Sequence, residues 1–171
     1  MGSEMCIRDR VYFFSCLANK QFTSTCWLRA IKEIDYIEEP DMFHDVFGHI
    51  PLLSNQIYSD FFQKLGELSV EFLEDDFKIK QLQRLYWFTV EYGLVKNQDT
   101  FDIYGAGIIS SEKEIKNVFS ENSIKKPFNL SEILKQDFII DKVQQIYFFI
   151  DSFDQLLGSI DEIRKLIKSK P

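Results

Sequence analysis

Apolar residues recur every three to four positions along most of this chain, which is the spacing of amphipathic helices. The segments with this period are 11–20, 57–73, 77–95 and 152–167. Two short runs, YGAGII at 104–109 and QQIYFFI at 144–150, are better strand candidates, and the polar stretch 120–126 is typical of a loop. We therefore expect a mainly α fold, a helical basket with one small β-sheet.

One carboxylate interrupts the apolar pattern of the third helical segment. Between Leu85 and Val95 the only charged side chain is Glu91. Burying an ionised carboxylate costs several kcal/mol unless a cation or strong donors meet it. The chain has two histidines, His44 and His49, five positions apart in EPDMFHDVFGHIPLL. Their proximity could be a coincidence, but one metal would account for both imidazoles and for the carboxylate.

The donor set and its spacing narrow the chemistry of such a site. Two imidazoles and one carboxylate with open positions suit a catalytic non-haem iron(II), although zinc stays possible on ligand type alone. Zinc hydrolases place two histidines at i and i+4 around a glutamate. A spacing of i and i+5 puts His44 and His49 about 140° apart on an ideal helix. The helix must end, tighten or loosen near Gly48, and we expect Gly48 and Pro51 to stop it, with Asp41 at its start and His49 at its frayed exit.

Three stretches carry a resemblance to a known family, namely DYIEEPDMFHDVFGHIPLL, LYWFTVEYGL and YGAGIISSEKEI. In this order and spacing they resemble the catalytic domain of the pterin-dependent aromatic amino acid hydroxylases, and most of all the bacterial phenylalanine 4-monooxygenases. The similarity runs from about residue 11 to about residue 157. It implies a monooxygenase that converts L-phenylalanine to L-tyrosine with dioxygen and a tetrahydrobiopterin-like tetrahydropterin. It also implies a central iron(II) held by His44, His49 and Glu91, which are then the catalytic residues.

The same resemblance assigns residues to substrate binding. Arg29 matches the arginine that binds the amino acid carboxylate, a task for which its planar fork is well suited. Trp87 matches an aromatic wall of the substrate pocket. Ser110 and Ser111 match hydroxyls behind the pocket that orient an iron-ligating histidine or the substrate. Without the resemblance, Arg29 would be interpreted as a surface charge and Trp87 as ordinary core.

The pterin side of the resemblance is less complete. Phe13 matches the aromatic residue on which the pterin stacks, Tyr86 a tyrosine near pterin and iron, and Asp45 an acidic residue that faces the pterin. The loop expected before Phe13 is replaced by MGSEMCIRDR, which resembles the forced translation of a sequencing adaptor. We therefore expect residues 1–10 to lie outside the fold and 11–171 to form a single, N-terminally truncated catalytic domain.

Individual positions bear on which amino acid is hydroxylated. Trp87 stands where the tryptophan hydroxylases carry Phe, and Ile140 where the tyrosine hydroxylases carry an acidic residue, so phenylalanine is the favoured substrate. Tyr92 departs from the family pattern beside the substrate, and Gln83 departs from it near the pterin.

The alternatives to a phenylalanine hydroxylase are a tyrosine or tryptophan hydroxylase, a truncated domain that binds iron but is catalytically impaired, a zinc hydrolase, or a non-catalytic helical domain with paired His and Glu.

Composition adds limits on partners and compartment. The 171 residues are 45% hydrophobic and 15% aromatic, with 17 Phe, enough for one sizeable core. The net charge of −7 offers no electrostatic case for nucleic acid. Three cysteines without metal-ligand spacing favour a reduced, cytoplasmic protein, and no apolar run is long enough to span a membrane. The terminal stretch SIDEIRKLIKSKP is too short for a convincing coiled coil, so we expect a monomer.

Overall fold

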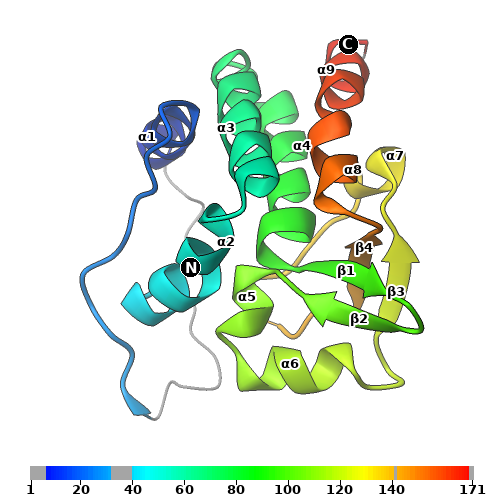
Figure 1. The fold of residues 1–171 in the computed structure, drawn as a ribbon. Coiled ribbons are helices and arrows are strands. Elements are labelled where there is room, and N and C mark those ends of the chain that lie inside the picture. Colours follow the sequence, from blue (N-terminus) through cyan, green and yellow to red (C-terminus); the bar gives the residue numbers. More distant parts are fainter. Residues whose placement is uncertain (1–6, 32–39, 141, 170–171) are drawn as a thin grey trace.

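The computed structural model describes residues 7–31, 40–140 and 142–169, in which helices gather around a small four-stranded sheet (Figure 1). The helices, of which η2 and η3 are π-helices, are α1 (Ile7–Ala18), η2 (His44–His49), α2 (Ile50–Leu53), α3 (Gln56–Val70), α4 (Asp76–Tyr86), η3 (Trp87–Glu91), α5 (Ala106–Ile109), α6 (Glu112–Val118), α7 (Leu130–Ile133), α8 (Phe153–Gly158) and α9 (Ile160–Lys168). The strands are β1 (Gly93–Asn97), β2 (Thr100–Ile103), β3 (Ile124–Pro127) and β4 (Ile146–Ile150). The predicted mainly α fold with one small sheet is confirmed.

Polar side chains cap the first turns of the long helices α3 and α4. The Asn55 side chain accepts a hydrogen bond from Tyr58 N at 3.1 Å at the start of α3, and Asp75 does the same for Lys78 N at the start of α4. Helix α3 lies against α1 at Gly66, where an added Cβ would come within 2.5 Å of the Ala18 nitrogen. These helices therefore meet through backbone, which holds α1 close to the core.

The sheet has the strand order β2-β1-β4-β3. Strand β1 is antiparallel to β2 and parallel to β4, and β3 is parallel to β4. Side chains of β4 alternate between two apolar clusters, since Phe148 and Ile150 join the large cluster that packs with α3, α4 and α9, whereas Tyr147 joins a smaller one with Ile108 of α5 and Val118 of α6. The predicted strand at QQIYFFI is confirmed, and the sheet separates the two clusters.

Several boundaries differ from the predicted ones. The run YGAGII is not a strand. Tyr104 and Gly105 are irregular, and Gly105 N is bonded to the carbonyl of Gly93 at 3.0 Å. The remaining four residues form α5. The helical segment 77–95 stops at Glu91, because Gly93 begins β1 against the Tyr104 ring, with no room for a Cβ. The expected loop 120–126 runs into β3, and the segment 152–167 is divided between α8 and α9.

The N-terminal expectation lies largely outside the described residues. Of residues 1–10, the structure describes only the backbone of 7–10, as the first turn of α1. The large apolar cluster runs from Phe14 in α1 to Ile167 in α9, so both ends of the described chain contribute to one core. None of the helices in the described ranges is both long and apolar enough to cross a membrane.

Candidate metal centre

The two histidines lie on a helical segment that is wider than an α-helix. In a π-helix backbone N–H groups bond five residues back, so residues five apart lie nearly above one another. The Ile50 nitrogen bonds to the carbonyl of Asp45 in this way at the end of η2. As a result, His44 and His49 point the same way, with their Nε2 atoms 3.0 Å apart. The sequence required the helix to end, tighten or loosen near Gly48, and the structure shows that it loosens into a π-helix.

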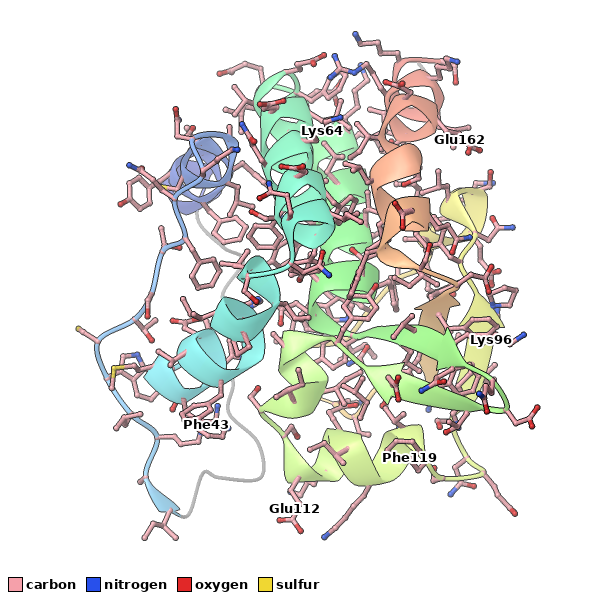
Figure 2. The ribbon with its side chains drawn as sticks, in the orientation of Figure 1. Phe43, Lys64, Lys96, Glu112, Phe119 and Glu162 are labelled. Carbon is pink, nitrogen blue, oxygen red and sulfur yellow. The ribbon has the colours of Figure 1, made fainter. Side chains whose placement is uncertain are left out.

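The expectation that Gly48 and Pro51 stop this helix, with His49 at a frayed exit, is wrong. The helix continues as α2, and Pro51 occupies its first turn, where a missing N–H costs nothing. Gly48 instead allows close packing, because an added Cβ would come within 2.8 Å of the Ala106 Cβ in α5. In Figure 2 the labelled Phe43 lies on the lower part of this cyan helix, across from α5.

A second π-helix supplies the carboxylate. Helix η3 continues α4, and the Tyr92 nitrogen bonds to the Trp87 carbonyl five residues back at 2.9 Å. The Glu91 carboxylate oxygens lie 3.4 Å from His44 Nε2 and 3.3 Å from His49 Nε2. Its side chain is 13% exposed. The three residues that the sequence singled out are therefore brought together from two separate helices.

This arrangement fits a metal ion. Donor atoms from His44, His49 and Glu91 all lie within 4.8 Å of one another. Ligands about 2.1 Å from one ion, at right angles to each other, are separated by about 3.0 Å, close to the spacings found here. Two imidazoles and a carboxylate on one side of an ion leave its other positions open. The donor set thus suits an ion such as iron(II) that also binds exchangeable ligands.

The electrostatics favour the protonation states that a metal needs. Burial raises the pKa of the Glu91 carboxyl, but the nearby His49 and His44 outweigh this effect and lower that pKa to about 2. Burial lowers the pKa of the His44 imidazole, and this effect exceeds the opposing attraction of Glu91. At neutral pH the carboxylate is ionised and His44 is neutral, which are the forms that coordinate metals.

Ser110 sets the orientation of the His44 ring. The Ser110 hydroxyl lies 2.8 Å from His44 Nδ1 and donates its own proton to the Ala106 carbonyl at 2.9 Å. It therefore accepts a hydrogen bond from Nδ1–H, which leaves Nε2 unprotonated and facing Glu91. His49 is held differently: its Nδ1 is buried without a hydrogen-bond partner in the described part of the chain, and its ring packs 4.9 Å from that of Phe22.

Arg29 is locked to a buried acid that the sequence suggested only as a helix start. The Arg29 guanidinium binds Asp41 through Nε at 3.0 Å and NH2 at 2.6 Å, and NH1 donates to the Ser110 carbonyl at 2.7 Å. Asp41 also accepts from the His44 backbone N–H at 3.0 Å. Burial raises the pKa of the Asp41 carboxyl, but these bonds outweigh it and hold that pKa well below its usual range. Asp41 therefore connects the arginine to the candidate metal ligand.

The remaining substrate-side residues lie around η3 and α6. The Trp87 ring stacks on Phe138 at 4.3 Å and lies 4.6 Å from the Tyr92 ring. Ser111 plays a different part from Ser110: its hydroxyl accepts from Glu114 N at 3.3 Å and caps α6, the helix between the labelled Glu112 and Phe119 in Figure 2.

The residues predicted for the pterin side also surround the metal ligands. Burial and the nearby Glu91 charge raise the pKa of the Tyr86 hydroxyl, and the Phe13 ring packs edge-on against Tyr86 at 5.3 Å. The Asp45 carboxylate is buried and accepts from the Thr25 backbone N–H at 2.7 Å and from the Thr25 hydroxyl at 3.0 Å. Neither Asp41 nor Thr25 was recognisable as part of a site, because the side chains that they bind, Arg29 and Asp45, lie 12 and 20 positions away.

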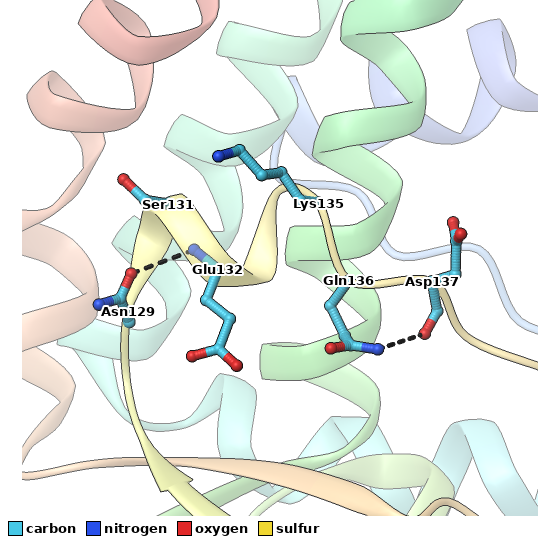
Figure 3. A pocket seen from close by; sticks show the side chains of 6 residues that line it. All are labelled: Asn129, Ser131, Glu132, Lys135, Gln136 and Asp137. Carbon is cyan, nitrogen blue, oxygen red and sulfur yellow. Dashed lines mark hydrogen bonds between the residues drawn. The ribbon is translucent and has the colours of Figure 1, made fainter.

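An open depression elsewhere on the surface contains none of these residues. It has a volume of about 580 Å³ and lies at α7, lined by Asn129, Ser131, Glu132, Lys135, Gln136 and Asp137 (Figure 3). The hydrogen bonds drawn there, from Glu132 N to Asn129 and from Gln136 to the Asp137 carbonyl, are local to the turn. Nothing in its lining resembles the donor set of the candidate metal centre.

Comparison with known proteins identifies the family of this site. The sequence model of the biopterin-dependent aromatic amino acid hydroxylases matches residues 5–170. This chain belongs to that family. Phenylalanine-4-hydroxylase of Mesorhizobium japonicum is 42% identical over 139 residues, which cover 79% of this chain and 50% of the relative. The Chromobacterium violaceum protein of the same name is 43% identical over 136 residues, covering 79% and 46% respectively.

Solved structures agree with the sequence relatives. Chromobacterium violaceum phenylalanine hydroxylase with bound iron(III) and the oxidised cofactor 7,8-dihydrobiopterin superimposes with a TM-score of 0.85 and 39% identity, over 95% of this chain and 60% of that chain. The family resemblance recognised in the sequence is thereby confirmed. The chain spans about half the length of the curated relatives it matches.

Proposed function

We propose that this chain is the catalytic part of a monooxygenase that hydroxylates L-phenylalanine to L-tyrosine with dioxygen and a tetrahydropterin at an iron(II) centre. The observation that carries the proposal is the convergence of His44, His49 and Glu91 from two π-helices, in a chain of the biopterin-dependent hydroxylase family. Iron(II) and tetrahydropterin, when bound, supply the activation of dioxygen, and the protein supplies binding, orientation and exclusion of water.

The side chains around the centre divide this work. His44, His49 and Glu91 would hold the iron and leave it positions open to dioxygen and substrates. Ser110 holds the His44 proton on Nδ1, so that Nε2 keeps its lone pair. The Tyr86 hydroxyl, whose pKa the nearby Glu91 charge raises, is proposed to limit the rotation of that carboxylate. Each of these groups acts by fixing geometry before the reaction.

The substrates are proposed to bind on two sides of the iron. Arg29 binds the amino acid carboxylate and Trp87 forms a wall for its aromatic ring, with Ser110 and Ser111 behind. This assignment is supported by the contact of Arg29 with the Ser110 carbonyl. Phe13, Asp45 and Tyr86 face the pterin, an assignment supported by the packing of Phe13 on Tyr86 beside Glu91.

The central test is metal-dependent tyrosine formation. The purified chain is expected to bind one iron(II) and to form tyrosine from phenylalanine only when iron, dioxygen and tetrahydropterin are all present. His44→Ala and Glu91→Gln are expected to abolish both iron binding and product, whereas the exposed Lys96→Ala, on β1, leaves both unchanged. Activity that persists after replacement of iron by zinc would overturn the proposal.

Arg29 offers a separate test of substrate orientation. Arg29→Ala is expected to raise the KM for the amino acid far more than that for the pterin. Arg29→Lys keeps the charge but loses the planar fork, so it is expected to recover only part of the affinity. Equal effects on both substrates would contradict the assigned role.

Substrate preference is the finer part of the proposal. A tyrosine 3-monooxygenase of Schistosoma mansoni is also a relative, 38% identical over 135 residues, so tyrosine is the main competing substrate. Competition among phenylalanine, tyrosine and tryptophan in one assay decides between them. A chain that binds iron yet turns over none of the three is the impaired domain considered above.

The organisation and setting of the chain complete the proposal. Residues 11–171 are proposed to form the single catalytic domain, supported by a core that runs from Phe14 to Ile167; removal of residues 1–10 should leave iron binding unchanged. The proposed absence of nucleic-acid affinity is supported by the net charge of −7 and is checked by filter binding, and the proposed monomer is checked by size exclusion. A cytoplasmic compartment is supported by Cys16 and Cys26, which are both free, and is checked by cell fractionation.

A further inference from the structure

In one glutamine outside the candidate metal centre, both polar atoms of the side chain are hydrogen-bonded. Gln144 is 6% exposed and lies just before β4. Its Oε1 accepts from the Trp87 indole Nε1 at 3.1 Å, and its Nε2 donates to the carbonyls of Ile139 at 2.9 Å and Lys142 at 2.8 Å. A single amide thus connects Trp87 to the segment that precedes β4. Buried amides with every group bonded hold one geometry, because any movement leaves a polar group without a partner.

The backbone of the same residue is anchored to α6. The Gln144 nitrogen donates to Glu114 Oε1 at 3.0 Å, and its carbonyl accepts from Asn117 Nδ2 at 2.7 Å. Glu114 is 1% exposed, and its second oxygen accepts from the Tyr147 hydroxyl. Gln144 is therefore held by α6 and β4 and cannot follow a movement of Trp87.

The indole needs such an attachment. Trp87 begins η3, the helix that ends at Glu91, and its ring packs against the rings of Phe138 and Tyr92. Stacking fixes the plane of a ring but tolerates sliding and rotation within that plane. The hydrogen bond to Gln144 removes this freedom, since it holds one edge of the ring at one point.

We propose that Gln144 is a positioning residue for amino acid selectivity: it fixes the in-plane orientation of Trp87 and the adjoining Phe138–Ile139 backbone, with Glu114 as its buried anchor. The inference rests on the proposed function, in which the substrate ring lies against Trp87. When the Trp87 ring has one fixed orientation, the space beside it accepts a phenyl ring and excludes a bulkier indole. When the Trp87 ring can slide, the site no longer distinguishes phenylalanine from tryptophan.

The first experiment needs only the wild-type chain. In 15N-labelled protein the Trp87 indole N–H should exchange with solvent about tenfold more slowly than that of Trp27, a residue that is 40% exposed. Gln144→Met should abolish this protection. The matched control is Gln145→Met at the next, exposed residue, which should leave it intact. Equal exchange of both indoles in the wild type would overturn the inference.

The second experiment measures selectivity. Gln144→Met should lower the ratio of kcat/KM for phenylalanine to that for tryptophan by about tenfold, through the KM for the amino acid, while the KM for the pterin stays the same. In a Trp87→Phe background, which removes the indole donor, Gln144→Met should change the ratio little further. Fully additive effects of the two substitutions would show that Gln144 does not act through Trp87.

The outcomes separate this inference from the proposed function. A wild-type chain that turns over no aromatic amino acid contradicts the proposed function, while the exchange experiment still reports on the attachment. A wild-type chain that turns over phenylalanine, with an unchanged ratio in a folded Gln144→Met variant, contradicts the inference alone. Near-ultraviolet circular dichroism establishes that the variant is folded.

Discussion

Two fully buried carboxylates support opposite sides of the candidate site, and they differ in what they meet. Asp41 is 0% exposed and binds the Arg29 guanidinium with two hydrogen bonds. Glu114 is 1% exposed and meets neutral donors, the Tyr147 hydroxyl and the Gln144 backbone N–H. The pKa of Asp41 is lowered although burial raises it, whereas burial raises the pKa of Glu114 despite its hydrogen bonds. Burial alone does not determine whether a carboxyl is ionised, because the groups that contact it also shift its pKa.

The two carboxylates also hold different kinds of group in place. Asp41 caps the backbone at His44 and orients Arg29, so the charged pair lies behind a candidate metal ligand. Glu114 anchors Gln144, which holds the Trp87 indole. A charged pair thus supports the metal side, and a network of neutral donors supports the aromatic side.

The largest effect is expected from removing the charge of Asp41. Asp41→Asn removes the negative charge that accepts two hydrogen bonds from the buried Arg29 guanidinium, which should lower the free energy of unfolding by about 3–5 kcal/mol. Urea denaturation of the metal-free protein measures this. The double variant Asp41→Asn with Arg29→Met removes both charges and should recover most of the loss. A single variant as stable as the wild type would mean that the pair contributes no more than an exposed one.

A smaller effect is expected from the corresponding change on the other side. Glu114→Gln keeps the shape but places an amide NH2 where one of two donors was accepted, at a cost of about 1–3 kcal/mol. The same denaturation assay applies, with the exposed Glu112→Gln at the start of α6 as control. A loss equal to that of Asp41→Asn would remove the distinction between the charged and the neutral network.

The pair Ser110 and Ser111 tests whether hydroxyl position matters for the metal. Ser110→Ala removes the group that holds the His44 proton, and metal affinity should fall by about 10–100-fold. Ser111→Ala removes the cap of α6 and leaves the Ser110 bond to His44 in place, which should cost about 1 kcal/mol of stability and leave metal affinity unchanged. Isothermal titration with iron(II) or cobalt(II) gives both affinities. Equal affinity losses for the two variants would contradict this division of roles.

The smallest effects are expected in the dependence of stability on pH, where the two carboxylates act with opposite sign. The lowered pKa of Asp41 gives stability that is present above the unfolded value of about 3.9 and is lost as the pH falls below it. The raised pKa of Glu114 gives stability that is present below about 4.3 and is lost as the pH rises toward the folded value. Urea midpoints measured across pH should show a weaker acid-side loss in Asp41→Asn and a weaker loss on raising the pH in Glu114→Gln. Parallel curves for the two variants would contradict the opposite signs.

Local patterns predicted much of the fold and the central residues of the site. The apolar period located α1, α3, α4 and α9, and the β-branched and aromatic run located β4. His44, His49 and Glu91 were recognisable because their residue types are rare or costly in their setting. The run 104–109 was misassigned because Gly105 is shaped by a contact with Gly93 twelve positions earlier, which no local pattern records.

The amino-acid sequence by itself determined the donor set, the helical character of the segments that carry it and the family to which the chain belongs. Only the tertiary structure decided that η2 and η3 are π-helices, that Gly48 lies against Ala106, and that Asp41 and Gln144 hold the site from behind. The physical reason is that an i and i+5 pair can face one metal only in a widened helix. Whether a helix widens depends on the packing and buried hydrogen bonds that distant segments supply.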